Sequence, residues 1–153
     1  MIKFNSSPDS TIGVELELQF VDVDTLDLKN IASKVLVDID KKFSNRIKSE
    51  FIESMIEINS DVCSSVNEVE KDITQSLHHL EEILKNYKAT LNCMSLHPFA
   101  RGKNQVVSNN PRYQSIMQGL QMVGRRFITQ GLHVHIGVDD CEKVIRINNA
   151  LRI

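Results

Sequence analysis

A strictly alternating segment near the N-terminus constrains the fold more than any other part of the sequence. Between residues 11 and 20 every second position is apolar, and the positions between them hold Gly13, Glu15, Glu17 and Gln19. Side chains of a β-strand point alternately to the two faces of a sheet. The segment therefore predicts a strand with one core face and one acidic face, which requires a sheet that is covered on one side only.

Apolar periodicity along the chain predicts further helices and strands. Spacings of three and four residues predict amphipathic helices, over residues 28–43, 65–87, 110–127 and from Asp139 or Asp140 onward. The second helix carries the capping-box pair Ser65 and Glu68, and Pro111 suits the first turn of the third. Strands are predicted over 47–59, with a bulge between Glu50 and Glu53, over 91–97 and over 132–138.

The polar strand faces decide between two sheet types. Alternating strands and helices are typical of a parallel sheet, but strands buried on both faces have continuous apolar runs. We therefore predict an α+β fold, an antiparallel sheet with helices on one face, and a single domain over residues 1–153. The last helical stripe, Val144, Ile147 and Leu151, is still running at the end of the sequence. We accordingly expect a domain that is incomplete at its C-terminus.

Charge and cysteine content narrow the function classes. With 18 basic and 20 acidic residues the net charge is −2, which disfavours nucleic acid and anionic membranes as partners. There is no apolar signal-peptide core, so we expect a cytoplasmic protein. Cys63, Cys93 and Cys141 are far apart and odd in number. They predict free thiols that pack as small buried hydrophobic residues, rather than a disulfide framework or a zinc knuckle.

The acidic face of the first strand is the strongest candidate for chemistry. Glu15 and Glu17 leave the same face about 7 Å apart. Two carboxylates at this separation raise each other's proton affinity unless a cation lies between them. Hard oxygen ligands suit Mg²⁺ or Mn²⁺. The competing interpretation is a solvated polar face, because acidic residues are usually exposed.

Two further strands repeat this arrangement. His133 and His135 are two residues apart on the strand predicted over 132–138, and Glu50, Glu53 and Glu57 lie in the strand predicted over 47–59. Strand histidines either bind metal or pack and hydrogen-bond without it. Three apolar strands that all present carboxylates or imidazoles on one face favour a shared cation site. A metal-dependent hydrolase that uses the two histidines remains an alternative, although barrel hydrolases need about 250 residues.

Five sequence blocks, in order, carry a resemblance to a known family. They are TIGVELELQFVD (11–22), EFIESMIEIN (50–59), SLHPFA (95–100), PRY (111–113) and GLHVHIGV (131–138). In order and approximate spacing they resemble the type 2 glutamate–cysteine ligases, the YbdK-like carboxylate–amine ligases. The resemblance spans nearly the whole chain. It departs from the family pattern at Ser95 and Leu96, where the family usually has Gly-Thr.

The resemblance implies a glutamine-synthetase-like catalytic domain in which a curved antiparallel sheet holds ATP and Mg²⁺ or Mn²⁺. It also implies site residues. Those implied as metal ligands are Glu15, Glu17, Glu50, Glu57, His133 and His135. Arg112 is implied as an anion contact to a substrate carboxylate or phosphate.

The implied reaction is that of an ATP-dependent ligase of glutathione biosynthesis. The glutamate γ-carboxylate is activated as an acyl phosphate, and the amine of cysteine, or of another substrate, attacks it to form a γ-glutamyl amide. Family members are roughly two and a half times as long as this chain. We therefore also consider a non-catalytic remnant, a homo-oligomer, and a half-subunit that needs a C-terminal partner.

Overall fold

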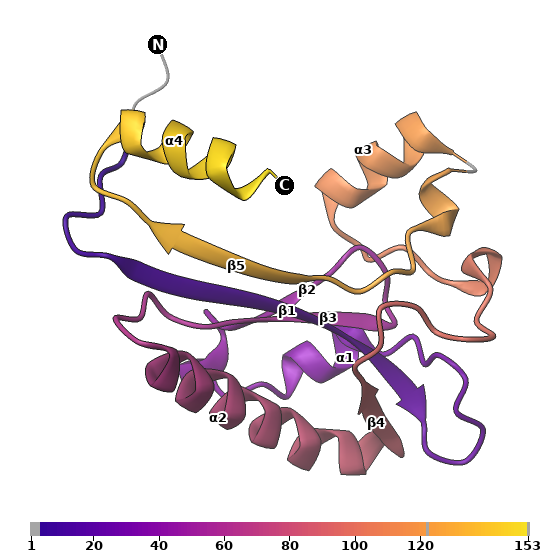
Figure 1. Cartoon of the computed structure of the whole chain (residues 1–153). Helices are drawn as coiled ribbons and strands as arrows, with labels where there is room; N and C mark the ends of the chain where they lie inside the picture. Colours follow the sequence, from indigo (N-terminus) through magenta and orange to yellow (C-terminus); the bar gives the residue numbers. More distant parts are fainter. Residues whose placement is uncertain (1–3, 122, 153) are drawn as a thin grey trace.

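The computed structural model describes residues 4–121 and 123–152, and in it the acidic segment is the central strand of an antiparallel sheet (Figure 1). This strand, β1 (Thr11–Asp22), pairs with three others. The remaining strands are β2 (Ile47–Ser49), β3 (Met55–Asn59), β4 (Ala89–Asn92) and β5 (Leu132–Gly137). The antiparallel α+β fold is as the alternating pattern predicts.

The two edges of β1 have different partners. One edge pairs with β3 over residues 15–19. The other edge pairs first with β5, over residues 11–16, and then with β4, over residues 19–22. β2 extends the sheet beyond β3. β1 is consequently the central strand of the sheet, with partner strands on both edges.

Helices α1 (Ala32–Val37) and α2 (Val66–Leu84) cover one face of the sheet, whereas α3 (Pro111–Leu120) and α4 (Cys141–Leu151) lie on the opposite side (Figure 1). The prediction of helices on one face therefore holds for α1 and α2 and not for α3 and α4. Under α1 and α2 lies the main core, which includes Leu18, Phe20, Ile56, Leu80 and Leu84, each at most 1% exposed. A smaller cluster joins the segment after β2 to α3. In the described part of the chain no helix is long and apolar enough to cross a membrane.

Two predicted elements differ from the structure. The helix predicted over 28–43 is split into α1 and the 3-10 turn η1 (Lys41–Phe43). The break follows from tertiary bonds, because the Asp38 carboxylate accepts a hydrogen bond from the Tyr87 hydroxyl and the Asp40 N–H donates to His79. The strand predicted over 47–59 is a hairpin of β2 and β3 rather than one bulged strand.

Other boundaries are shifted. α2 begins at the predicted Ser65 cap, whose hydroxyl accepts the Glu68 N–H. α3 ends at Leu120 instead of continuing to Phe127. Three further 3-10 turns lie between the other elements: η2 (Lys85–Tyr87), η3 (Gly102–Asn104) and η4 (Gly124–Arg126). The strand predicted over 91–97 is β4, which begins and ends earlier.

The cysteine prediction is half right. All three cysteines are free thiols, and Cys63 is buried. Cys93 and Cys141, however, are exposed. They lie after β4 and at the start of α4, where the neighbouring residues are likewise exposed or half-buried. The prediction of buried packing is therefore wrong for these two.

Candidate metal-binding site

Pairing with β1 brings distant residues to one face of the sheet. Glu17 pairs directly with Glu57 of β3, and Glu15 pairs directly with His133 of β5. Directly opposed residues of an antiparallel pair project to the same face with their Cβ atoms about 5 Å apart. The alternation of β1 thus places both glutamates on the face away from α2, because Leu16, Leu18 and Phe20 occupy the core face.

Three carboxylates converge at the end of the β2–β3 hairpin. One oxygen each from Glu17, Glu50 and Glu57 lies within 4.8 Å of the others, and all three residues are half-buried. Neighbouring donors hold the group in place: the Asn59 side-chain amide donates to Glu57 Oε1 at 2.7 Å, and the Gly131 N–H donates to Glu17 Oε2 at 2.7 Å. The cluster is therefore oriented by residues outside it.

Electrostatics within this cluster favour a bound cation. Burial raises the pKa of Glu50, and the nearby negative charges of Glu17 and Glu57 raise it further. Burial and the nearby negative charges of Glu50 and Glu57 raise the pKa of Tyr113 to about 12, so its hydroxyl stays protonated 3.4 Å from Glu50 Oε2. Crowded carboxylates are stabilised by a hard divalent cation. Their oxygens are the donor set that Mg²⁺ or Mn²⁺ prefers.

A second group forms around Glu15. Its Oε2 lies 3.2 Å from His133 Nδ1 and 3.3 Å from His135 Nε2, and both imidazoles are more than half exposed. Slight burial acts to raise the pKa of Glu15, but hydrogen bonds from His135 and His133 leave it below its ordinary value. One carboxylate oxygen flanked by two imidazoles offers mixed oxygen and nitrogen ligands, a set less suited to Mg²⁺ than the three carboxylates.

The six predicted ligands therefore share one face but divide into two groups. Arg112 is exposed in the first turn of α3, where its backbone N–H donates to the Asn110 side chain. Its neighbour Tyr113 is the α3 residue that reaches the carboxylates. Glu53 accepts a hydrogen bond from the Ser33 N–H and so belongs to the start of α1 rather than to the site.

Sequence reasoning missed three residues that orient the ligands. Asn59 and Gly131 each lie two residues from a predicted ligand, and Tyr113 follows Arg112 directly. The spacing of Asn59 on the same strand face as Glu57 was a usable signal. The roles of Tyr113 and Gly131 depend on contacts between segments more than 60 residues apart, so no local pattern could show them.

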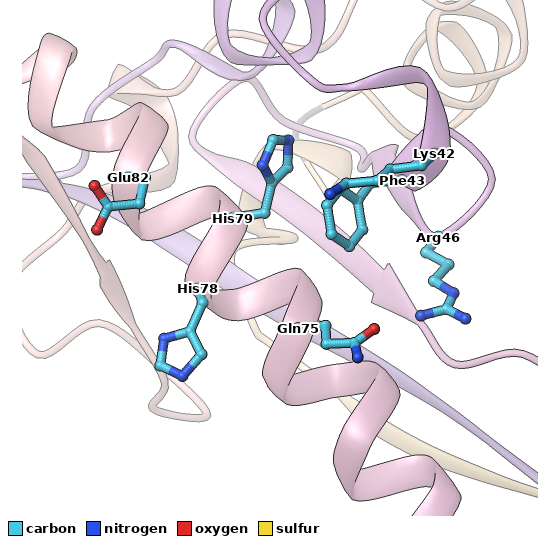
Figure 2. Close-up of a pocket in the computed structure, with 7 residues that line it drawn as sticks. All are labelled: Lys42, Phe43, Arg46, Gln75, His78, His79 and Glu82. Carbon is cyan, nitrogen blue, oxygen red and sulfur yellow. The ribbon is translucent and has the colours of Figure 1, made fainter.

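A cavity of about 650 Å³ lies elsewhere, between η1 and the outer side of α2 (Figure 2). His79 stacks on Phe43 with ring centres 4.4 Å apart, and its Nε2 accepts the Asp40 N–H at 3.1 Å. These contacts fix η1 against α2 and use the acceptor nitrogen of the imidazole. The cavity thus has a structural explanation, and we assign it no part in the candidate site.

Comparison with known proteins places these observations in a family context. The family model described as glutamate–cysteine ligase family 2 matches residues 11–153. Proteins of Mycobacterium tuberculosis and Mycobacterium ulcerans that carry the assigned name glutamate–cysteine ligase 2 are 34% and 35% identical over 150 residues, 98% of this chain. The chain spans only 39% and 38% of their lengths.

Solved structures support the fold. A glutamate–cysteine ligase of Francisella tularensis in complex with AMP is similar over 95% of this chain and 30% of its own, with a TM-score of 0.65 and 19% identity. A bifunctional glutathione synthetase of Pasteurella multocida covers 95% of this chain and 19% of its own, with a TM-score of 0.61 and 13% identity. At these identities the similarity establishes shared architecture alone.

Proposed function

The chain belongs to glutamate–cysteine ligase family 2, and from this premise we propose that it carries the cation-binding part of an ATP-dependent carboxylate–amine ligase. The observation that carries the proposal is the convergence of Glu17, Glu50 and Glu57, with one oxygen of each within 4.8 Å of the others. Their chemistry fits Mg²⁺ or Mn²⁺. Glu15, His133 and His135 would complete the ligand set on the same face, between β1 and β5.

The reaction we propose joins a carboxylate to an amine at the expense of ATP, with glutamate and cysteine or another amine as substrates. Transfer of the ATP γ-phosphoryl group to the glutamate γ-carboxylate would release ADP and form an acyl phosphate, and attack of the amine on its carbonyl carbon would form the γ-glutamyl amide and release phosphate. Bound cations would neutralise the triphosphate and stabilise charge on the transferring group. The family name and the ligase names of the relatives support this assignment.

Residues of this chain would bind and orient rather than transfer protons. The Asn59 and Gly131 donors fix the directions of Glu57 and Glu17, and the Tyr113 hydroxyl lies against Glu50. Arg112, exposed beside Tyr113, would meet an anionic substrate group at the rim. Arg is well suited to this role because its planar guanidinium binds carboxylate or phosphate in a bidentate manner.

A cation titration tests the proposal directly. We expect Mn²⁺ to bind the wild-type chain and Mg²⁺ to compete with it, and we expect Glu17→Gln to weaken binding at least tenfold, the effect typical of losing a group in or next to a metal's ligand set. Isothermal titration calorimetry measures both constants. Glu70→Gln, an exposed change on α2, is the matched control. Binding that is absent in the wild type, or unaffected by Glu17→Gln, would contradict the assignment.

A second candidate is a half-site that acts only with a further polypeptide. Two observations favour it: the chain spans 39% of the length of its M. tuberculosis relative, and Leu132, Val134 and Ile136 of β5 are each more than half exposed. Exposed apolar side chains on an outer strand are typical of surfaces that pack against another segment. The partner we consider is a polypeptide equivalent to the rest of the relatives.

ADP release with ATP, Mg²⁺, glutamate and cysteine separates the two candidates. Turnover by the 153-residue chain alone would support an autonomous ligase. Turnover only after the C-terminal part of a relative is added would support the half-site. We do not propose the metal-dependent hydrolase considered from the two histidines, because the family is one of ligases. Tight Zn²⁺ binding that survives Glu15→Gln together with Glu17→Gln would reopen that alternative.

A further inference from the structure

We propose that Gly131 is a positioning residue of the cation site. Its amide would orient the Glu17 carboxylate, and its missing side chain would keep open the space between Glu17 and His133. The inference rests on the proposed function and deepens it, because it assigns a task to a residue without any ligand atom. Gly131 lies directly before β5 and so enters the site together with the strand that carries both histidines.

The first observation is a pair of hydrogen bonds between two residues that are 114 positions apart. The Gly131 N–H donates to Glu17 Oε2 at 2.7 Å, and the Glu17 N–H donates to the Gly131 carbonyl at 3.0 Å. Gly131 therefore fixes both the backbone and the side chain of Glu17. A donor–acceptor distance of 2.7 Å is that of a strong, charge-assisted bond.

The second observation is steric. A Cβ atom on residue 131 would lie 3.2 Å from His133 Nε2 and 3.3 Å from Glu17 Oε2, closer than ordinary van der Waals contact. The backbone itself does not demand glycine here, because no glycine of the described residues has a positive φ. What the position demands is space. That space lies between a carboxylate of the first ligand group and an imidazole of the second.

These two observations give Gly131 one combined effect. The amide occupies one side of Glu17 Oε2 and leaves the other carboxylate lone pairs for a cation. A methyl group at this position would displace the Glu17 carboxylate, the His133 ring or both from their present directions. Groups that orient metal ligands typically change affinity by 10- to 100-fold when altered. The expected consequence is a loss of cation affinity without a comparable loss of folding.

Gly131→Ala and Gly13→Ala form a matched test. Gly13 lies on β1, and a Cβ there would meet only ordinary contacts, 3.9 Å from His135 Cβ and 3.9 Å from Ser60 Oγ. We expect Gly131→Ala to weaken Mn²⁺ binding by about tenfold or more, and Gly13→Ala to change it less than twofold. The measurements are Mn²⁺ titrations followed by electron paramagnetic resonance and thermal unfolding of the cation-free proteins.

The outcomes separate this inference from the proposed function. If the wild type does not bind Mn²⁺, both are overturned. If the wild type and Gly131→Ala bind equally, only the role of Gly131 is overturned. If Gly131→Ala loses affinity only because it unfolds at a far lower temperature than Gly13→Ala, the change is structural and the positioning role is likewise overturned.

A second measurement does not depend on a change at residue 131. The chain has six glycines, so ¹⁵N-glycine labelling gives few amide signals. The Gly131 amide proton should lie downfield and move upfield in Glu17→Gln, because the charge of its acceptor is lost. Glu70→Gln should leave it in place. A Gly131 signal that is insensitive to Glu17→Gln would overturn the hydrogen bond on which the inference depends.

Discussion

The two halves of β1 belong to different environments. From Leu18 to Val21 the strand is at most 5% exposed, pairs with β3 up to Gln19 and with β4 from Gln19 onward, and packs under α2. From Thr11 to Glu17 it is half-exposed and pairs with β5, whose residues are largely exposed. Glu15 and Glu17, one from each ligand group, lie in this N-terminal part. We call the two parts the closed half and the open half of β1.

The comparison shows how one continuous strand can serve stability and binding separately. The closed half is fixed by the apolar packing of Leu18 and Phe20, and the buried amide of Gln19 donates a hydrogen bond to the Ile128 carbonyl. The open half is held mainly by backbone pairing and keeps its carboxylates accessible to small ions. Because the strand is continuous, the packed half fixes the direction in which Glu15 and Glu17 project. A rigid element of this kind suits a preorganised site.

The largest expected effect is on folding, from truncation in the closed half. Phe20 is 0% exposed, so Phe20→Ala should reduce the free energy of unfolding by about 3–5 kcal/mol. Val134 of β5 is 56% exposed, so Val134→Ala should reduce it by less than about 0.5 kcal/mol. Urea denaturation of both variants measures the contrast. Equal losses would show that β5 is packed as firmly as the core.

The next effect should fall on cation binding and spare stability. Glu57→Gln removes one charge from the three-carboxylate cluster while its amide keeps the shape of the side chain. We expect Mn²⁺ affinity to fall at least tenfold. The unfolding free energy without cation should hold or rise, because like charges no longer repel. Calorimetry and urea denaturation on the same sample test this. A large loss of stability without a loss of affinity would contradict a binding role for Glu57.

Two acidic residues, Asp22 next to the closed half of β1 and Glu50 in the carboxylate cluster beside the open half, should affect the pH dependence of stability with opposite signs. Asp22 closes the packed end of β1, and its hydrogen bond with Lys29 lowers its pKa from 3.8 to about 2. The stability it contributes is present above pH 3.8 and is lost as the pH falls toward 2. Glu50 has a pKa raised above 4.5 by burial. Its folded form holds the proton more tightly, so stability is lost as the pH rises from 4.5 through that raised pKa.

Asp22→Asn and Glu50→Gln test these signs in chelator-treated protein. Asp22→Asn should flatten the decline in the urea midpoint between about pH 4 and pH 2. Glu50→Gln should remove the decline that appears above pH 4.5, and so gain on the wild type as the pH rises. Unfolding midpoints from pH 2 to 7 measure both. A loss of stability in Glu50→Gln at neutral pH would show that its ionised carboxylate is stabilised in the fold.

Most of the fold could be predicted from local patterns, and the misses have a common cause. The alternation of residues 11–20 and the Ser65 cap depend on neighbours in sequence, and both predict their elements correctly. The split of the helix predicted over 28–43 depends on Tyr87 and His79, which are at least 39 residues away from their partners Asp38 and Asp40. Tertiary hydrogen bonds override the apolar period there.

The sequence predicts which face of the sheet holds the candidate site, but it does not predict how the ligands are grouped on that face. Spacing places Glu15, Glu17 and Glu57 on one side of the sheet, yet only strand pairing shows that Glu17 joins Glu57 while Glu15 joins the histidines. The register between β1 and β5 is set by residues far apart in sequence. For the same reason the sequence could not show that Gly131 reaches Glu17.

The smallest expected effect concerns two helix caps. It tests whether α4, which follows β5 on the open side of the sheet, can unfold separately from the core. The Ser65 hydroxyl accepts the Glu68 N–H at 3.3 Å, whereas the Asp140 carboxylate accepts the Lys143 N–H at the shorter distance of 2.9 Å. Bond length alone would make Asp140 the more important cap. Burial argues the reverse, because α2 buries Val69, Leu80 and other core residues, whereas α4 buries none of its described side chains.

Ser65→Ala should therefore lower the unfolding free energy of the whole protein by about 1 kcal/mol. Asp140→Ala should lower it by less than about 0.3 kcal/mol, because a helix that buries nothing can fray without unfolding the core. Its effect should appear instead as faster amide exchange confined to α4. If Asp140→Ala costs as much global stability as Ser65→Ala, then α4 unfolds together with the core. The open and closed halves would in that case form one cooperative unit.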